Sequence, residues 1–440
     1  MNRYLIKATG VGALGGLLFG FDTAVIAGTT QQLSTVFHLT PLTLGLTVSI
    51  GLAGTVIGAM GSGVLGQRIG GREALRIMAV LYMISAVGCA WAWSWPVLMA
   101  ARFIGGLGIG GSSVLGPVYI AELAPPKWRG RMVGLFQINI VIGILLAYLS
   151  NYIITLFKLG AVQWRWEFGV AVVPSIFFLV FLYGIPRSSR WLVTTNRTVE
   201  AREVLEMMGS PNSDEELKEI IESVQMESGL NREPLFKRQY RLPIFLAITI
   251  GIFNQLSGIN AILYYSNFIF ASAGFSSASA ALQTVGIGVV NLLATFLGMA
   301  MIDKVGRKTL LMIGAIGMAA ALGGTAVIFQ VKSHQNLLLP LLILFIIFFA
   351  ISQGSVIWVY LAEVFPTRVR SKGQSLGSSA HWIMNGLIAL SFPYIAAKSQ
   401  AAPFAFFAVM MLLQLAVVWF VYPETKGSSL EAIQSSFGIH

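Results

Sequence analysis

Charged residues are scarce in this sequence. Asp, Glu, Lys and Arg make up 11% of its 440 residues, against about 25% in soluble domains. Acidic side chains number only 18, and Asp22 is the only one among the first 72 residues. So little charge over this length, with 56% hydrophobic residues, excludes an ordinary soluble domain and indicates that lipid is the solvent.

Residues that carry covalent or metal chemistry are also few. The single cysteine, Cys89, excludes an intrachain disulfide. The sequence shows no metal-ligand cluster, no nucleotide-binding loop and no nucleophile–base pair. The glycine run "GGLGIGG" (105–111) lies within an apolar segment, where close helix packing is the better interpretation. We therefore expect no enzyme, no cofactor and no metal.

Long apolar runs fill most of the chain. About 20 apolar residues are needed for a helix to cross a bilayer, and only helices and closed barrels span one. The sequence predicts an all-α membrane protein with twelve transmembrane helices in two groups of six. The runs lie near 9–29, 43–65, 75–93, 98–121, 132–154, 167–185, 243–271, 280–302, 309–330, 338–361, 374–396 and 402–422.

Lysine and arginine gather at alternate connections between these runs. Such an excess marks the cytoplasmic side of a membrane protein, so we expect both termini and 187–241 in the cytoplasm. The net charge of +11 is then a topology signal and predicts no nucleic-acid partner. The clusters lie at 68–76, 127–131, 187–241, 304–308 and 368–372.

The two halves of the chain resemble each other. "VYIAELAPPKWRG" (118–130) matches "VYLAEVFPTRVRS" (359–371), and "GQRIGGR" (66–72) matches "IDKVGRK" (302–308). Parallel six-helix repeats are a transporter plan that places the substrate site at their interface near mid-membrane. The pattern predicts four parts: an N-terminal six-helix bundle at 1–186, a cytoplasmic helical linker at 187–241, a C-terminal six-helix bundle at 242–422 and a cytoplasmic tail at 423–440.

The motifs together resemble the sugar porter branch of the major facilitator superfamily, which includes bacterial proton-coupled glucose and xylose symporters and animal facilitative glucose transporters. The resemblance covers nearly the whole chain and implies the major facilitator fold. Departures are Gln67 and Gly70-Gly71-Arg72 in the first cytoplasmic motif, Arg187 and Ser189 in "PRSSRWL", and Ser355 where Gly-Pro is common. The motifs are "ELAPPKWRGR", "DKVGRK", "PRSSRWL", "NQLSGINAILYY", "WVYLAEVFP" and "PETKG".

Polar side chains within the seventh run indicate a sugar site. "FNQLSGINAILYY" carries Asn254, Gln255, Asn260 and Tyr264 in an apolar segment, where polar groups normally face an interior or a watery cavity. Amides both donate and accept hydrogen bonds, as sugar hydroxyls do. The alternative is that they join helices to one another. The resemblance adds Gln137, Asn291, Trp358, Trp382 and Asn385, and it places His381 where relatives carry Asn or Gln.

Asp22 stands out as a carboxyl group deep in the first run. Burial favours its neutral form, whereas a nearby arginine favours its charged form, and a proton carrier needs such a balance. The resemblance implies that Arg102 is the arginine, because the proton symporters carry this Asp and Arg while facilitative members carry Asn. The alternative is a structural pair without proton traffic.

The resemblance also implies a network of charges that closes the cytoplasmic gate. It comprises Arg68, Glu122, Arg129, Asp303, Arg307, Glu363 and Arg370. We therefore predict a monomeric cell-membrane importer of a hexose or pentose, with the sugar, protons and the bilayer as partners. The alternatives are a facilitative uniporter, a polyol carrier, a drug or organic-ion antiporter and a nutrient sensor.

Overall fold

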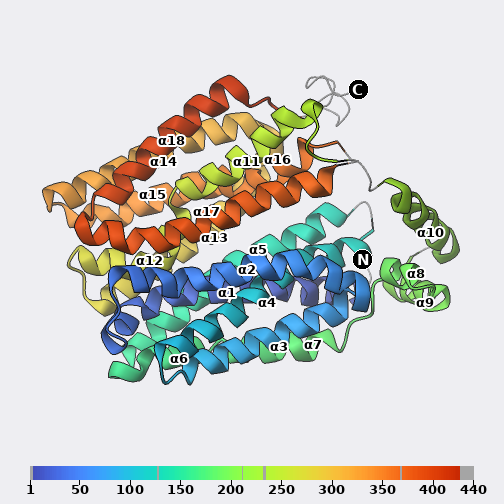
Figure 1. Ribbon diagram of the computed structural model, residues 1–440, viewed down its shortest axis with the longest axis horizontal. Coiled ribbons are helices and arrows are strands. Elements are labelled where there is room, and N and C mark those ends of the chain that lie inside the picture. Colours follow the sequence, from blue (N-terminus) through green and yellow to red (C-terminus); the bar gives the residue numbers. More distant parts are fainter. Residues whose placement is uncertain (1–2, 126–127, 211, 231–233, 367–368, 427–440) are drawn as a thin grey trace. The chain divides into compact units, whose positions relative to one another are not determined.

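The computed structural model describes residues 3–125, 128–210, 212–230, 234–366 and 369–426, and its regular structure over these ranges is entirely helical (Figure 1). The first half contains α1 Arg3–Val36, α2 Pro41–Ile69, α3 Gly71–Ala90, α4 Trp95–Leu123, α5 Arg129–Leu156, α6 Gln163–Gly169 and α7 Val172–Leu182. The linker forms α8 Ser189–Thr194, α9 Thr198–Met208 and α10 Ser213–Leu230. The second half contains α11 Arg241–Leu256, α12 Ile259–Ser272, α13 Ser277–Val305, α14 Arg307–Val331, α15 Leu338–Ile351, α16 Gln353–Glu363, α17 Arg370–Lys398 and α18 Ala402–Val421.

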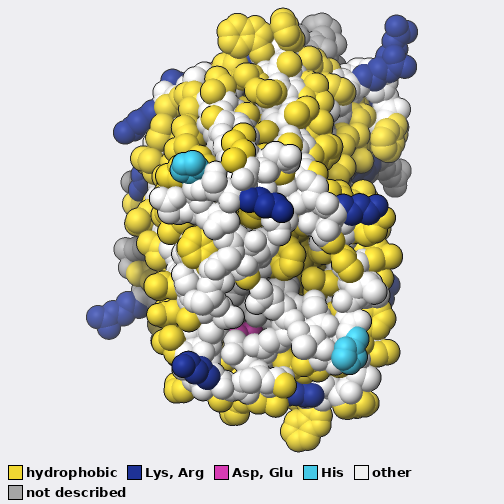
Figure 2. Space-filling view, turned by 90° about the vertical axis from the view of Figure 1, so that its left-hand side faces the viewer, with side chains coloured by type: hydrophobic (Ala, Val, Ile, Leu, Met, Phe, Trp, Pro, Cys, Tyr) yellow, Lys and Arg dark blue, Asp and Glu magenta, His cyan; other side chains and the backbone are white. Residues whose placement is uncertain are grey.

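Eleven helical segments in the described part of the chain are long and apolar enough to cross a membrane. The predicted span at 374–396 lies in α17, which has 29 residues but is too polar to be counted among these eleven segments. The polar side chains of α17 include His381 and Asn385, two of the predicted sugar ligands. Exposed hydrophobic side chains such as Phe420 and Met60 suit lipid, and Figure 2, which looks onto one end of the spans, shows hydrophobic residues mainly around the edges of the view.

The chain divides into two compact units. The first comprises Met1–Val25, Ile50–Ser150 and Gly160–Arg232. In this unit, α3 packs against α4, α6 and α7. Apolar side chains of the linker, such as Leu192 and Ala201, belong to the same hydrophobic core. The linker helices pack against one another, and α8 also packs against α4; Figure 1 shows α8, α9 and α10 gathered beyond one end of the spans of this unit.

The second unit comprises Ile26–Ser49, Asn151–Leu159 and Glu233–His440. Here α14 packs against α15 and α18, α13 packs against α15, and α11 packs against α17. At one end of this unit, buried Tyr360 and Tyr422 stack with ring centroids 5.3 Å apart. These contacts hold α11, α12, α16 and α17, the helices that carry most of the predicted sugar ligands.

The repeat in the sequence reappears as repeated local geometry. Gly70 (φ 94°, ψ 150°) joins α2 to α3, and Gly306 (φ 105°, ψ 157°) joins α13 to α14, a left-handed backbone that glycine adopts readily. The Tyr119 hydroxyl donates to the Pro186 carbonyl at 2.6 Å, as the matching Tyr360 hydroxyl donates to Pro423 at 3.3 Å. Each half therefore ties its fourth span to the chain that follows its sixth.

The span containing α15 and α16 is broken although it lacks the proline common in the family. Ser352 lies between the two helices with φ −115° and ψ −93°. Its hydroxyl donates to the Phe348 carbonyl at 2.5 Å, and the Ser355 hydroxyl donates to the Ala350 carbonyl at 2.7 Å. Two serines thus satisfy carbonyls near the break, a role that nearby side chains often take in membrane helices.

Glycines allow α1 and α5 to cross closely. A Cβ atom on Gly20 would overlap the Ile140 carbonyl oxygen, and one on Gly143 would overlap the Leu17 carbonyl oxygen. Such small residues let helix backbones approach in a membrane. The crossing lies beside Asp22, two residues beyond Gly20.

We expect Gly20→Ala to lower the melting temperature of the purified protein by several degrees, because the added methyl group costs about 1–3 kcal/mol in a packed site. Thermal unfolding in detergent measures the effect. Gly10→Ala on the same helix is the matched control, because no atom lies within 4 Å of its added Cβ. Equal melting temperatures for the two variants would contradict the close crossing.

Candidate functional site

Asp22 and Arg102 form an ion pair within the first unit. Arg102 Nη1 lies 3.5 Å from Asp22 Oδ2, and the two side chains are 5% and 13% exposed. A close charge-assisted hydrogen bond of this kind measures about 2.7–2.9 Å. The pair is therefore nearly shielded from water, yet its ion pair is long and weak. Protonation of Asp22 would then sacrifice only a weak interaction with Arg102.

The surroundings of the pair are small, apolar or weakly polar. Gly105 lies beside the carboxylate, since a Cβ there would be 3.6 Å from Asp22 Oδ1. The Arg102 guanidinium lies 5.7 Å from the Phe168 ring centroid. Its Nε atom is buried with no hydrogen-bond partner in the described structure. Few other polar groups thus interact with the guanidinium, and Asp22 is its main counterion.

A break between α11 and α12 in the second unit presents the predicted amides. Gly258 takes a left-handed backbone, with φ 82° and ψ 7°, which a larger residue would strain. The Ser257 hydroxyl donates to the Asn254 carbonyl at 2.6 Å. The sequence "NQLSGIN" therefore breaks the span so that Gln255 and Asn260 meet across it.

Gln255 is the centre of this amide cluster. Its Nε2 donates to Asn254 Oδ1 at 2.9 Å, and its Oε1 accepts from Asn260 Nδ2 at 2.9 Å. The same Nε2 lies 3.3 Å from both ring nitrogens of His381 on α17. Asn254 and Gln255 are 3% and 1% exposed. The cluster is neutral and offers both donors and acceptors to an uncharged polar ligand.

Aromatic rings line the same region. The Trp358 ring of α16 lies 5.3 Å from the His381 ring, and the Trp382 ring lies 5.1 Å from it at 86°. Trp358 is 39% exposed, so its face is open to a ligand while its neighbours are buried. Aromatic faces next to amides suit a sugar, which has apolar C–H faces and polar hydroxyls.

Asn385 and Tyr264 pair with each other about one helical turn beyond His381 and Asn260. Asn385 Nδ2 donates to the Tyr264 hydroxyl at 3.0 Å. Asn385 Oδ1 is buried and, among the described residues, has no hydrogen-bond partner. A buried acceptor without a donor costs free energy, so this oxygen is a ready acceptor for a hydroxyl.

Two predicted sugar ligands are not gathered into this cluster. Asn291 is 6% exposed on α13, and its side chain hydrogen-bonds none of the other predicted ligands in the described structure. Gln137 is half-buried on α5 and belongs to the first unit. Their part in sugar binding stays a prediction.

Part of the predicted gate network forms at one end of the second unit. Arg307 holds Glu363 with two contacts, Nη2 to Oε1 at 2.8 Å and Nε to Oε2 at 3.2 Å, and it pairs with Asp303 at 3.0 Å. Arg370 Nε donates instead to the Phe365 carbonyl at 3.3 Å. The three remaining members, Arg68, Glu122 and Arg129, belong to the first unit, and their part in closing the gate stays a prediction.

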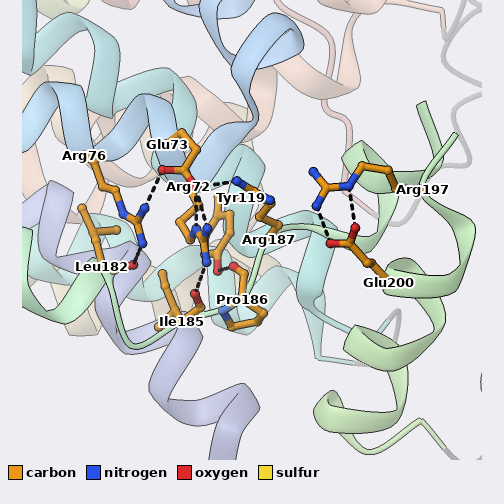
Figure 3. A network of polar contacts seen from close by, with 10 residues as sticks. All are labelled: Arg72, Glu73, Arg76, Tyr119, Leu182, Ile185, Pro186, Arg187, Arg197 and Glu200. Atoms are coloured by element: carbon orange, nitrogen blue, oxygen red, sulfur yellow. Dashed lines mark hydrogen bonds and ion pairs between the residues drawn. The ribbon is translucent and has the colours of Figure 1, made fainter. Parts of the chain in front are cut away.

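Glu73 was missed by the sequence reasoning, and Figure 3 shows it at the centre of the network in the first unit. Arg72, Arg76 and Arg187 all pair with this carboxylate, at 2.5, 2.6 and 3.3 Å. Arg72 also donates to the Ile185 carbonyl at 2.9 Å, and Arg76 to the Leu182 carbonyl at 3.2 Å. Arg187, a departure from the family motif, thus finds a carboxylate partner. The sequence feature that could have predicted this network is "REALR" (72–76), an acid flanked by basic residues.

Glu424 of the "PETKG" motif is a second missed residue. Its carboxylate accepts from the backbone N–H of Arg307 at 2.8 Å and of Lys308 at 3.1 Å. These are the first residues of α14, where the helix dipole favours a negative charge. The Thr425 hydroxyl donates to Glu363 Oε2 at 2.6 Å. The closing motif therefore fixes the residues around Arg307 and Glu363.

The helical fold, the loose ion pair and the neutral amide cluster define a membrane transporter, and the comparisons identify its family. The model of the sugar (and other) transporter family matches residues 8–437. The chain belongs to this family; it is an integral membrane protein with the major facilitator fold, and it is a transporter and not an enzyme.

Several known proteins are similar over nearly the full length. The D-xylose-proton symporter of Escherichia coli strain K12 is 35% identical, with 99% of this chain and 96% of that protein covered. The glucose transporter GlcP of Staphylococcus epidermidis is 37% identical, with coverages of 98% and 97%. The inward open structure of the xylose transporter XylE from E. coli has a TM-score of 0.88 at 34% identity, covering 98% of this chain and 100% of that one.

Proposed function

We propose that this protein is a proton-coupled monosaccharide symporter that imports a hexose or pentose by alternating access. The observation that carries the coupling is the nearly dry, 3.5 Å pair of Asp22 and Arg102. The neutral cluster around Gln255 supports a sugar as the other substrate. The relatives named as xylose-proton, arabinose-proton and glucose transporters support the same substrate class.

The chemistry of the pair gives the coupling step. A proton on Asp22 removes its negative charge and with it the attraction for Arg102, so the pair separates. The two bundles then change conformation with sugar bound, and loss of sugar and proton inside restores the pair. A deprotonated Asp22 holds Arg102 and opposes the transition with sugar bound but no proton, while the empty carrier returns, which ties the movement of the sugar to that of the proton.

The remaining details of the proposal concern organisation. We propose that the parts 1–186, 187–241, 242–422 and 423–440 are the N-terminal bundle, linker, C-terminal bundle and tail, and that both termini are cytoplasmic. Residues 427–440 of the tail lie outside the described residues. The protein would work as a monomer in the cell membrane.

Purified protein in proteoliposomes tests the function. We expect D-xylose or D-glucose uptake to exceed equilibrium when the outside is more acidic, with alkalinisation of the outer medium on sugar addition. A proton ionophore should abolish the accumulation but leave exchange of labelled for unlabelled sugar. Sugar entry that stops at equal concentrations and moves no protons would instead show a facilitative uniporter.

A further inference from the structure

A pair of buried amides lies next to the amide cluster without belonging to the predicted sugar ligands. Gln353 Nε2 donates to Gln414 Oε1 at 2.6 Å, and the two side chains are 0% and 1% exposed. Gln414 comes from α18, whose other residues are apolar or aromatic. Burying two amides among apolar side chains costs free energy unless they are hydrogen-bonded. The pairing satisfies Gln353 Nε2 and Gln414 Oε1, whereas Gln353 Oε1 has no hydrogen-bond partner among the described residues.

Gln353 lies where the broken span resumes as a helix. It is the first residue of α16, directly after the non-helical Ser352. Its main-chain carbonyl accepts from Asn254 Nδ2 at 3.4 Å, and Asn254 Oδ1 in turn accepts from Gln255 Nε2 at 2.9 Å. The start of α16 is thus held from α18 by the Gln414 side chain and from α11 by Asn254.

A second path leads from Gln353 to the same place. Five residues further along α16, Trp358 places its ring 5.3 Å from the His381 ring, and His381 lies 3.3 Å from Gln255 Nε2. Gln353, Asn254, Gln255, His381 and Trp358 therefore form a closed circuit of contacts through three helices. A shift at Gln353 moves both the amide and the aromatic side of the cluster.

We propose that Gln353 and Gln414 are positioning residues of the sugar site: their buried pair fixes the start of α16 and thereby sets Gln255 and Trp358 against the sugar. This rests on the proposed sugar transport. Neither amide contacts the sugar. Gln414 anchors Gln353 from α18, and Gln353 acts through Asn254 on one side and through the helix that carries Trp358 on the other.

Calorimetric titration of D-xylose and D-glucose into the purified full-length protein, with thermal unfolding of the same samples, tests the proposal. Gln414→Leu leaves the Gln353 amide unpaired and should weaken sugar binding about tenfold, while also lowering the melting temperature. Adding Gln353→Leu replaces the unpaired amide by an apolar contact. We expect the double variant to recover much of its melting temperature but to keep the weak binding.

Thr325→Val is the matched control, because it removes a buried hydroxyl of α14 that bonds only its own helix at 2.9 Å; its sugar affinity should equal that of the wild type. Affinity that returns together with stability in the double variant would reduce the pair to a structural role and overturn the proposal. So would wild-type affinity in Gln414→Leu. Failure of the wild type to bind either sugar overturns the proposed function itself, a different result.

Discussion

Asp22→Asn is expected to abolish uphill sugar accumulation while leaving sugar exchange intact. An imposed difference of one pH unit is worth about 1.4 kcal/mol per proton and supports about tenfold accumulation if one proton accompanies each sugar. Asparagine keeps the size and one hydrogen-bond acceptor for Arg102 but cannot bind and release a proton in this way. The accumulation ratio in proteoliposomes should therefore fall to about one.

The matched control for this variant is Asp214→Asn. Asp214 is a carboxylate on α10 that pairs with Arg202 at 2.8 Å, but its side chain is 71% exposed, and exposed pairs contribute little. Accumulation by this control should match the wild type. If Asp22→Asn still concentrates sugar against its gradient, Asp22 is not the coupling residue and the Asp22–Arg102 pair is structural.

The melting temperature separates coupling from folding in the same experiment. The pair is nearly dry, so removing one partner leaves the buried Arg102 charge without its counterion and destabilises the protein. The long 3.5 Å separation and the acceptor kept by asparagine limit this loss. A variant that binds sugar, exchanges it and unfolds at a modestly lower temperature has lost the coupling alone.

The sequence predicted those features that depend on local composition. Apolar length located the spans, and one carboxyl group in an apolar run identified Asp22. It also predicted the amides near Gln255, because polar residues inside a span are rare and costly. Such signals need only the residue and its neighbours along the chain.

Features that depend on partners distant in the sequence were not predicted. Glu73 was passed over although three arginines converge on it, because Arg187 reaches it from 114 positions away and stands where the family motif has an acid. Gln414 was passed over as a single polar residue, since only the folded chain shows that Gln353 is opposite it. Without the proline at Ser355, the sequence did not predict a break here, yet the span is broken and two hydroxyls satisfy carbonyls beside the break.

Gln255→Ala should have the largest effect on sugar binding. The side chain donates and accepts at the centre of the cluster, so a bound sugar would lose two hydrogen bonds worth about 0.5–1.5 kcal/mol each. The deletion also leaves Asn254 Oδ1 and Asn260 Nδ2 without their present partner, and each is then free to turn away. Together these losses predict binding about 100-fold weaker, measured by titration of D-xylose or D-glucose.

Gln283→Ala is the matched control in the same unit. Its amide is half-buried on α13 and donates to the Ser279 hydroxyl at 3.2 Å, one turn along its own helix. This control removes the same atoms without touching the cluster, so its sugar affinity should equal that of the wild type. Because Asp22 belongs to the other unit, sugar uptake by the Gln255→Ala variant, measured at saturating sugar, should still increase when the outer medium is acidified. Equal affinities for the two variants would show that Gln255 joins helices and does not hold the sugar.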